Sequence, residues 1–65
     1  MYVLTRAVNK TEFIFYLMDS GGRPLKAKIE KTFLGRAIEL TRMFAKENNT
    51  DIWEINTDKG REIVD

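Results

Sequence analysis

The chain has no cysteine and no histidine among its 65 residues. Without cysteine there can be no disulfide, no thiolate metal site and no thiol nucleophile. Without histidine the commonest transition-metal ligand and the histidine-based catalytic triads are also excluded. Carboxylate pairs near the C-terminus are the remaining catalytic option, but a chain this short has little room for the deep cleft that such pairs need. We therefore expect no enzyme, no metal and no cofactor.

Long apolar runs are also missing. No segment approaches the ~20 apolar residues that span a bilayer, and the N-terminal MYVLTRAV lacks a basic region ahead of an apolar stretch. These absences favour a cytoplasmic protein. The length and the 43% hydrophobic content predict one small globular domain over residues 1–65. Such a domain buries only ~60% of its unfolded surface, so small domains often gain stability from a disulfide, a metal or a partner subunit. The composition excludes a disulfide and metal sites built from Cys or His, which leaves a partner subunit.

The net charge is only +1, but the charges are unevenly placed. Residues 23–36 carry five cations and one anion, whereas residues 47–65 carry six anions and two cations. Charge runs of this kind most often line solvated faces. The global balance therefore gives no general attraction to nucleic acid.

Alternation of apolar and polar residues predicts strands, and a 3.6-residue period after Thr32 predicts one helix that ends at Asn48-Asn49. The expected strands cover residues 2–8, 11–18, 25–31, 51–56 and 61–64. The order β-β-β-α-β-β predicts an α+β fold. We expect an antiparallel β-meander, one helix packed across the sheet, and a C-terminal β-hairpin.

The segment EFIFYLM, residues 12–18, is apolar on both of its faces. In a strand Phe13, Phe15 and Leu17 point to one side, and Ile14, Tyr16 and Met18 point to the other. We expect the first set to lie beneath the helix. The second set then needs a different cover.

The first turn decides which residues of the first strand join each face. With Asn9-Lys10 as a two-residue turn, Val8 pairs with Thr11. That register places Tyr2 and Leu4 on the core face, and it places Val3 on the second face.

The register of the third strand has two options. A five-residue loop over residues 19–23 pairs Leu25 with Leu17 and sends Ala27 and Ile29 to the core. A loop over residues 20–23 pairs Leu25 with Met18 and flips every side chain of that strand. The second face would then be apolar across three strands, and a partner would be close to obligatory. We favour the five-residue loop, because the alternative buries two lysines under the helix at high cost.

There are two candidates to cover the second face: the hairpin that contains Trp53, and another protein. A patch without internal cover marks a partner site, and Tyr and Met are enriched at interfaces. We therefore expect a non-catalytic module for protein–protein interaction, either a homodimer or a regulator of another protein. Lys26 and Lys28 form its charged rim. The expected interface residues are Val3, Ile14, Tyr16 and Met18.

The alternative function is nucleic-acid binding through the same sheet surface. In the favoured register Lys26 and Lys28 flank Tyr16, and Arg23 lies nearby. Lysines can neutralise phosphates while a tyrosine stacks on a base. The expected contact residues for this function are Arg23, Lys26, Lys28 and Tyr16.

Overall fold

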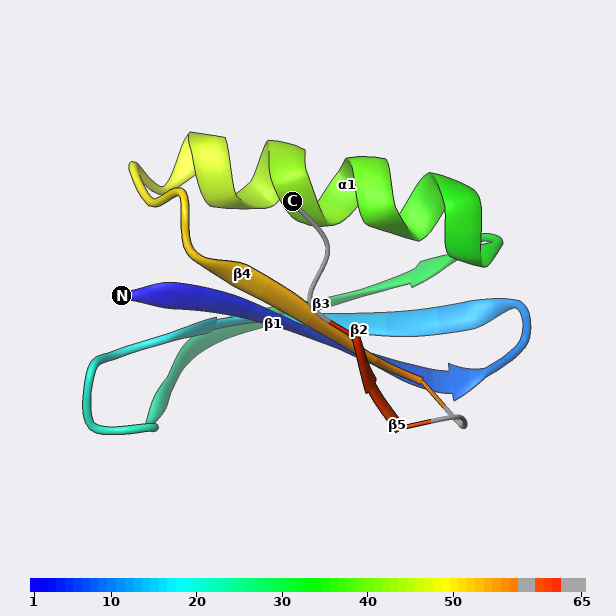
Figure 1. The fold of residues 1–65 in the computed structure, drawn as a ribbon, viewed down its shortest axis with the longest axis horizontal. Coiled ribbons are helices and arrows are strands. Elements are labelled where there is room, and N and C mark those ends of the chain that lie inside the picture. The colour runs from blue at the N-terminus through cyan, green and yellow to red at the C-terminus, as the bar shows by residue number, and fades with distance from the viewer. Residues whose placement is uncertain (58–59, 63–65) are drawn as a thin grey trace.

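The computed structural model describes residues 1–57 and 60–62 and shows one helix packed on one side of a β-sheet (Figure 1). The elements are β1 (Tyr2–Asn9), β2 (Glu12–Met18), β3 (Pro24–Lys31), α1 (Leu34–Glu47), β4 (Trp53–Thr57) and β5 (Gly60–Glu62). The predicted α+β class, the β1-β2-β3 meander and the single helix on the sheet are confirmed. The turn of the expected C-terminal hairpin, residues 58–59, lies outside the described residues.

The sheet is mixed, so the expectation of a fully antiparallel sheet is wrong. The strand order is β3-β2-β1-β4-β5, and β4 runs parallel to β1, with Val3 beside Trp53 and Thr5 beside Ile55. A helix of 14 residues carries the chain back along the sheet before β4 begins. A connection of that length joins parallel strands, whereas a tight turn joins antiparallel ones.

The first turn is shifted by one residue from the predicted turn. Lys10-Thr11 forms the loop, where the Thr11 amide donates to Asn9 Oδ1 at 2.9 Å. Ala7 pairs with Phe13 and Asn9 pairs with Glu12, so Val8 is an extra residue in a β-bulge. The predicted pairing of Val8 with Thr11 is therefore wrong, and the faces of β1 are exchanged.

The second turn also contains a bulge, and the register that we favoured for β3 is wrong. Leu17 pairs with Lys26 and Met18 pairs with Pro24, which leaves Leu25 as the extra residue. The turn is held by Asp19 Oδ1, which accepts hydrogen bonds from the backbone amides of Gly21 and Arg23 at 2.8 and 2.9 Å. The predicted five-residue loop over residues 19–23 is therefore confirmed, but the bulge gives β3 the flipped arrangement from Lys26 onward.

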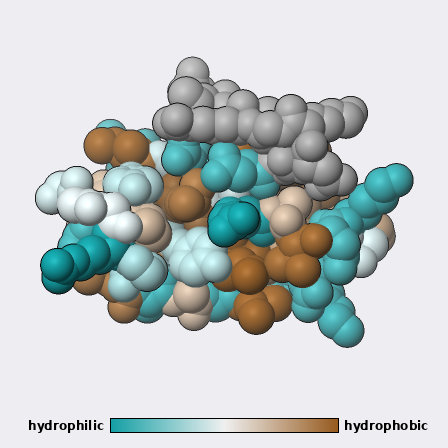
Figure 2. Space-filling view, turned by 90° about the horizontal axis from the view of Figure 1, so that it is seen from below, coloured by the Kyte–Doolittle hydropathy of each residue, from teal (hydrophilic) through white to brown (hydrophobic). Residues whose placement is uncertain are grey.

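The lysines of β3 lie on the helix side of the sheet without being buried. The helix lies over β1, β2 and β4 but does not reach β3 at the edge of the sheet. Lys26 is exposed, and the half-buried Lys28 places its Nζ 5.0 Å from the ring centroid of Phe44. The free-energy cost of burying these two lysines under the helix, which argued against this register, is therefore absent. The opposite side of the sheet faces away from the helix (Figure 2).

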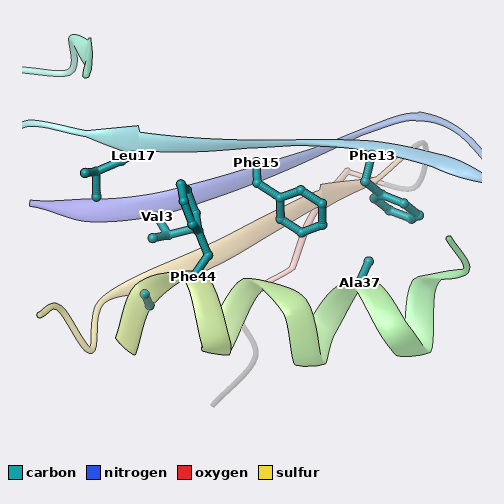
Figure 3. Packing of buried hydrophobic residues seen from close by; sticks show 7 residues of the cluster. Val3, Phe13, Phe15, Leu17, Ala37 and Phe44 are labelled. Atoms are coloured by element: carbon teal, nitrogen blue, oxygen red, sulfur yellow. The ribbon is translucent and has the colours of Figure 1, made fainter. Parts of the chain in front are cut away.

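The core lies between α1 and the helix side of the sheet. Phe13, Phe15 and Leu17 point toward Ala37 and Phe44 of the helix, as Figure 3 shows, which confirms the predicted core face of β2. Val3 joins them with no exposed surface. The helix begins after Phe33, an N-cap residue with extended backbone and no side-chain capping bond.

The C-terminal end of the helix agrees with the sequence. Asn48 is the C-cap and Asn49 adopts a left-handed φ of 57°. The helix is too short to cross a membrane, and there is no second helix in residues 1–57 or 60–62.

Candidate functional site

The side of the sheet that faces away from the helix carries an apolar surface that extends over three strands. Pleating and register assign its members, because alternate residues of a strand share one face. We call this surface the outer face. It consists of Tyr2 and Leu4 of β1, Ile14, Tyr16 and Met18 of β2, and Ala27 and Ile29 of β3.

The outer face is built from cross-strand rows that run from β1 to β3. Tyr16 lies between Leu4 and Ala27, and in the next row Ile14 lies between the exposed Arg6 and Ile29. Figure 2 shows this side of the molecule, where hydrophobic residues lie in groups with hydrophilic residues between and around them. Ile29 is 62% exposed, whereas Tyr16 and Ile14 are half-buried against their neighbours.

A shallow hollow of about 210 Å³ lies on the outer face beside Tyr16. Its lining is formed by Leu4, Arg6, Tyr16, Met18 and Pro24. Met18 forms its most enclosed part, with only 9% of its surface exposed. The hollow has room for one side chain with an apolar body and a polar end, and the polar end would then lie beside Arg6.

Charges of both signs border the apolar rows. Glu12 pairs with Lys31 at one end of the sheet. Arg6 follows Leu4 along β1, and Glu54 of β4 pairs with Leu4. The rim is therefore electrostatically mixed, as protein interfaces commonly are.

The outer face contains three of the four predicted interface residues. Ile14, Tyr16 and Met18 lie on it, but Val3 belongs to the buried core, so its predicted position is wrong. Sequence reasoning missed Tyr2, Leu4, Ala27 and Ile29. The bulges at Val8 and Leu25 moved them there, and neither residue has a side chain that signals a bulge.

Trp53 does not cover the outer face. It lies in β4 beside Val3 and packs against the core cluster on the helix side. Its ring also lies 6.0 Å from the guanidinium carbon of Arg42 on the helix. The alternative in which Trp53 covers Ile14 and Tyr16 is therefore wrong.

The residues proposed for nucleic-acid binding do not share a surface. Lys26 and Lys28 pair with Leu17 and Phe15, so they lie on the helix side, whereas Tyr16 lies on the outer face. Arg23 is an exposed residue at the end of the β2–β3 turn. The predicted combination of phosphate-binding lysines with a stacking tyrosine is therefore absent.

The described acidic residues form no compact cluster. No three His, Cys, Asp or Glu side chains come together in residues 1–57 and 60–62 in a way that could hold a metal ion. A second hollow, of about 320 Å³, lies between the end of α1 and the start of β4. Its lining includes Arg42, Lys46, Asp51, Trp53 and Thr50, whose hydroxyl donates a hydrogen bond to the Met1 carbonyl at 2.9 Å.

Comparisons with protein-family models, with curated proteins and with solved structures give no match for this chain.

Proposed function

We propose that this protein is a non-catalytic binding module that holds another protein against its outer face. The observation that carries the proposal is the register of β3, which extends the apolar surface of β1 and β2 over a third strand. Ile29 in particular is a large apolar side chain with 62% of its surface exposed. Contiguous apolar surfaces with a polar rim are typical of protein-binding sites.

The dimensions of the molecule fit the centre of a small interface. The outer face covers three strands of seven or eight residues, so it measures about 26 by 14 Å, or roughly 350 Å². A standard interface takes about 800 Å² from each partner, so the outer face would form its apolar centre and the charged residues around it the rim. Tyr16, in the middle row beside the hollow, is the natural energetic centre.

The charges around the outer face favour a protein over a nucleic acid. Arg6 and Lys31 are matched by Glu12 and Glu54 on the same side of the sheet. A phosphate backbone needs a net positive surface. A protein partner instead gains from burial of the apolar rows and from charges of either sign at the rim.

Replacement of Tyr16 by Glu should remove partner binding while the fold survives. A charge in the centre of the outer face must lose its hydration when a partner docks, so we expect binding to weaken by at least about 30-fold. The measurement is quantitative capture of proteins from an extract of the cells that produce the chain. Urea denaturation of the same variant should show the cooperative transition of the wild type.

The matched control is Met43→Glu, which places the same charge on an exposed apolar residue of the helix. Proteins bound by the wild type and by Met43→Glu, but lost with Tyr16→Glu, would be partners of the outer face. A set of captured proteins that is the same for all three chains would refute the proposal.

A further inference from the structure

The edge of the sheet at β3 has an unusual distribution of exposed residues. β3 is the last strand on its side, it has eight residues, and among the described residues only β2 pairs with it. Three large hydrophobic side chains lie along this strand or just beyond its end: Leu25, Ile29 and Phe33 are 54%, 62% and 71% exposed. They are spaced symmetrically, with four positions on either side of Ile29.

The backbone of β3 shows which of its groups are free to pair. The Thr32 amide donates to the Thr11 carbonyl at 2.9 Å, so the polar backbone groups at position 32 point toward β2. In an antiparallel ladder these directions alternate along the strand. Glu30 and Lys28 therefore bond β2 through their backbone, whereas the N–H and C=O groups of Ala27, Ile29 and Lys31 point to the free edge.

We propose that β3 pairs antiparallel with β3 of a second copy of this chain, with Ile29 opposite Ile29. Only outward-pointing residues can form hydrogen-bonded pairs across the edge, which limits the register to combinations of positions 27, 29 and 31. In this register Ala27 also pairs with Lys31 of the second copy. The two chains would exchange two hydrogen bonds at each of these pairs.

The charges of β3 select this register over the others. If Ala27 lies opposite Ala27 of the second copy, Lys26 comes opposite Lys28. If Ala27 lies opposite Ile29 of the second copy, the Lys28 residues of the two chains come opposite each other. If Ile29 lies opposite Lys31 of the second copy, the Glu30 residues of the two chains come opposite each other. If Lys31 lies opposite Lys31 of the second copy, two lysines face each other directly. Like charges directly opposite each other are destabilising. Only Ile29 opposite Ile29 avoids every such contact and sets Lys28 opposite Glu30, once on each side of the symmetry axis.

The exposed hydrophobic residues support the same register independently of the charges. With Ile29 on the axis, position 25 of one chain is level with position 33 of the other, so Leu25 comes opposite Phe33 twice. Edge lysines normally discourage pairing between strands. Here Glu30 of the second copy neutralises Lys28, and the apolar residues lie at the centre and both ends of the contact.

The symmetry of this pairing determines the shape of the dimer. Antiparallel edge pairing about Ile29 has its twofold axis perpendicular to the sheet, so both outer faces lie on the same side. Ile29 of each chain would join the two apolar surfaces into one. The pairing rests on β3 alone and does not depend on the proposed function of the outer face.

Charge exchange at positions 28 and 30 tests the register by sedimentation equilibrium over a concentration series. Lys28→Glu alone and Glu30→Lys alone each set like charges opposite each other twice, so each should weaken the dimer at least about tenfold. The double variant K28E/E30K restores opposite charges and should recover the wild-type dimer. An equimolar mixture of the two single variants should form a heterodimer.

A single cysteine tests the position of the axis. The chain has no cysteine of its own, so Ile29→Cys places one thiol per chain where the opposed Cα atoms lie about 5.5 Å apart, a distance that a disulfide spans. Ala27→Cys is the matched control, because its two thiols would lie about four residues, or ~14 Å, apart along the strands. Oxidation should link Ile29→Cys far faster than Ala27→Cys.

A wild-type chain that stays monomeric at several hundred micromolar would overturn the proposal. So would a dimer that neither single charge variant weakens, or one in which Ala27→Cys is linked as readily as Ile29→Cys. A wild-type chain that forms no dimer but still binds the partners captured through Tyr16 would refute the edge pairing alone.

Discussion

Phe15→Ala is expected to abolish stable folding. Phe15 has no exposed surface and lies in the middle of the cluster that joins β1 and β2 to the helix. Truncation of a buried phenylalanine costs about 3–5 kcal/mol, and the single core of a domain this small supplies only about 3–5 kcal/mol of stability. Urea denaturation followed by circular dichroism should show a largely unfolded chain in the absence of denaturant.

The neighbouring residue provides the control for this effect. Tyr16 belongs to the same strand but to the outer face, where cross-strand contacts contribute about 0.2–1 kcal/mol each. Tyr16→Ala should therefore leave a folded chain with a transition at slightly lower urea concentration. Equal losses for the two variants would contradict the assignment of a single core on the helix side.

Thr41→Val is expected to be the second most damaging change, although it preserves the shape of the side chain. Thr41 Oγ1 donates to the carbonyl of Ala37 at 2.7 Å and lies 2.7 Å from Thr5 Oγ1. Because its one proton is used in the helix, Thr41 must accept the proton of Thr5. Valine at position 41 removes this acceptor and leaves the buried Thr5 hydroxyl unpaired, at a cost of about 1–3 kcal/mol.

A double-mutant cycle separates this bond from other effects of the substitution. Thr5→Val combined with Thr41→Val removes both buried hydroxyls, so the double variant should lose less stability than the two single variants added together. We expect a coupling of about 0.5–2 kcal/mol from urea denaturation of the four chains. Strict additivity would show that the two threonines do not depend on each other.

The strands and the helix were largely predictable, because they follow from local periodicity. Residues 12–18 are apolar on both faces, and strand geometry alone separates Phe15 from Tyr16. The face of Phe13, Phe15 and Leu17 is predicted to be the core face because it has the larger side chains. The faces of β1 and β3 did depend on turns. One extra residue at Val8 and another at Leu25 reversed both strands relative to β2.

These bulges have no signature in the residues that form them. The turn next to Leu25 is held by Asp19 Oδ1, which bonds two backbone amides, and Asn9 accepts from the Thr11 amide in the first turn. Asn and Asp indicate turns in a sequence, but they do not state whether a bulge follows in the strand next to the turn. The position of Val3 in the core was therefore beyond sequence reasoning.

The rejected register of β3 illustrates a second limit. The cost of burying Lys26 and Lys28 was argued on the assumption that the helix covers all three N-terminal strands. β4 instead adds to the sheet beside β1, and the helix lies over the centre of the widened sheet. Strand order is a tertiary property, and here it decides that the helix side of β3 stays open to solvent.

The outer face exists as one apolar surface only if β3 has the register described here. The most direct test is the set of cross-strand contacts between Hα protons in a nuclear Overhauser spectrum of the labelled chain, since opposed residues in non-hydrogen-bonded pairs have Cα atoms only about 4.5 Å apart. We predict strong contacts between Ile14 and Ile29 and between Tyr16 and Ala27. Contacts of Phe13 with Ile29 and of Phe15 with Ala27 in their place would put the apolar side of β3 under the helix and contradict the account.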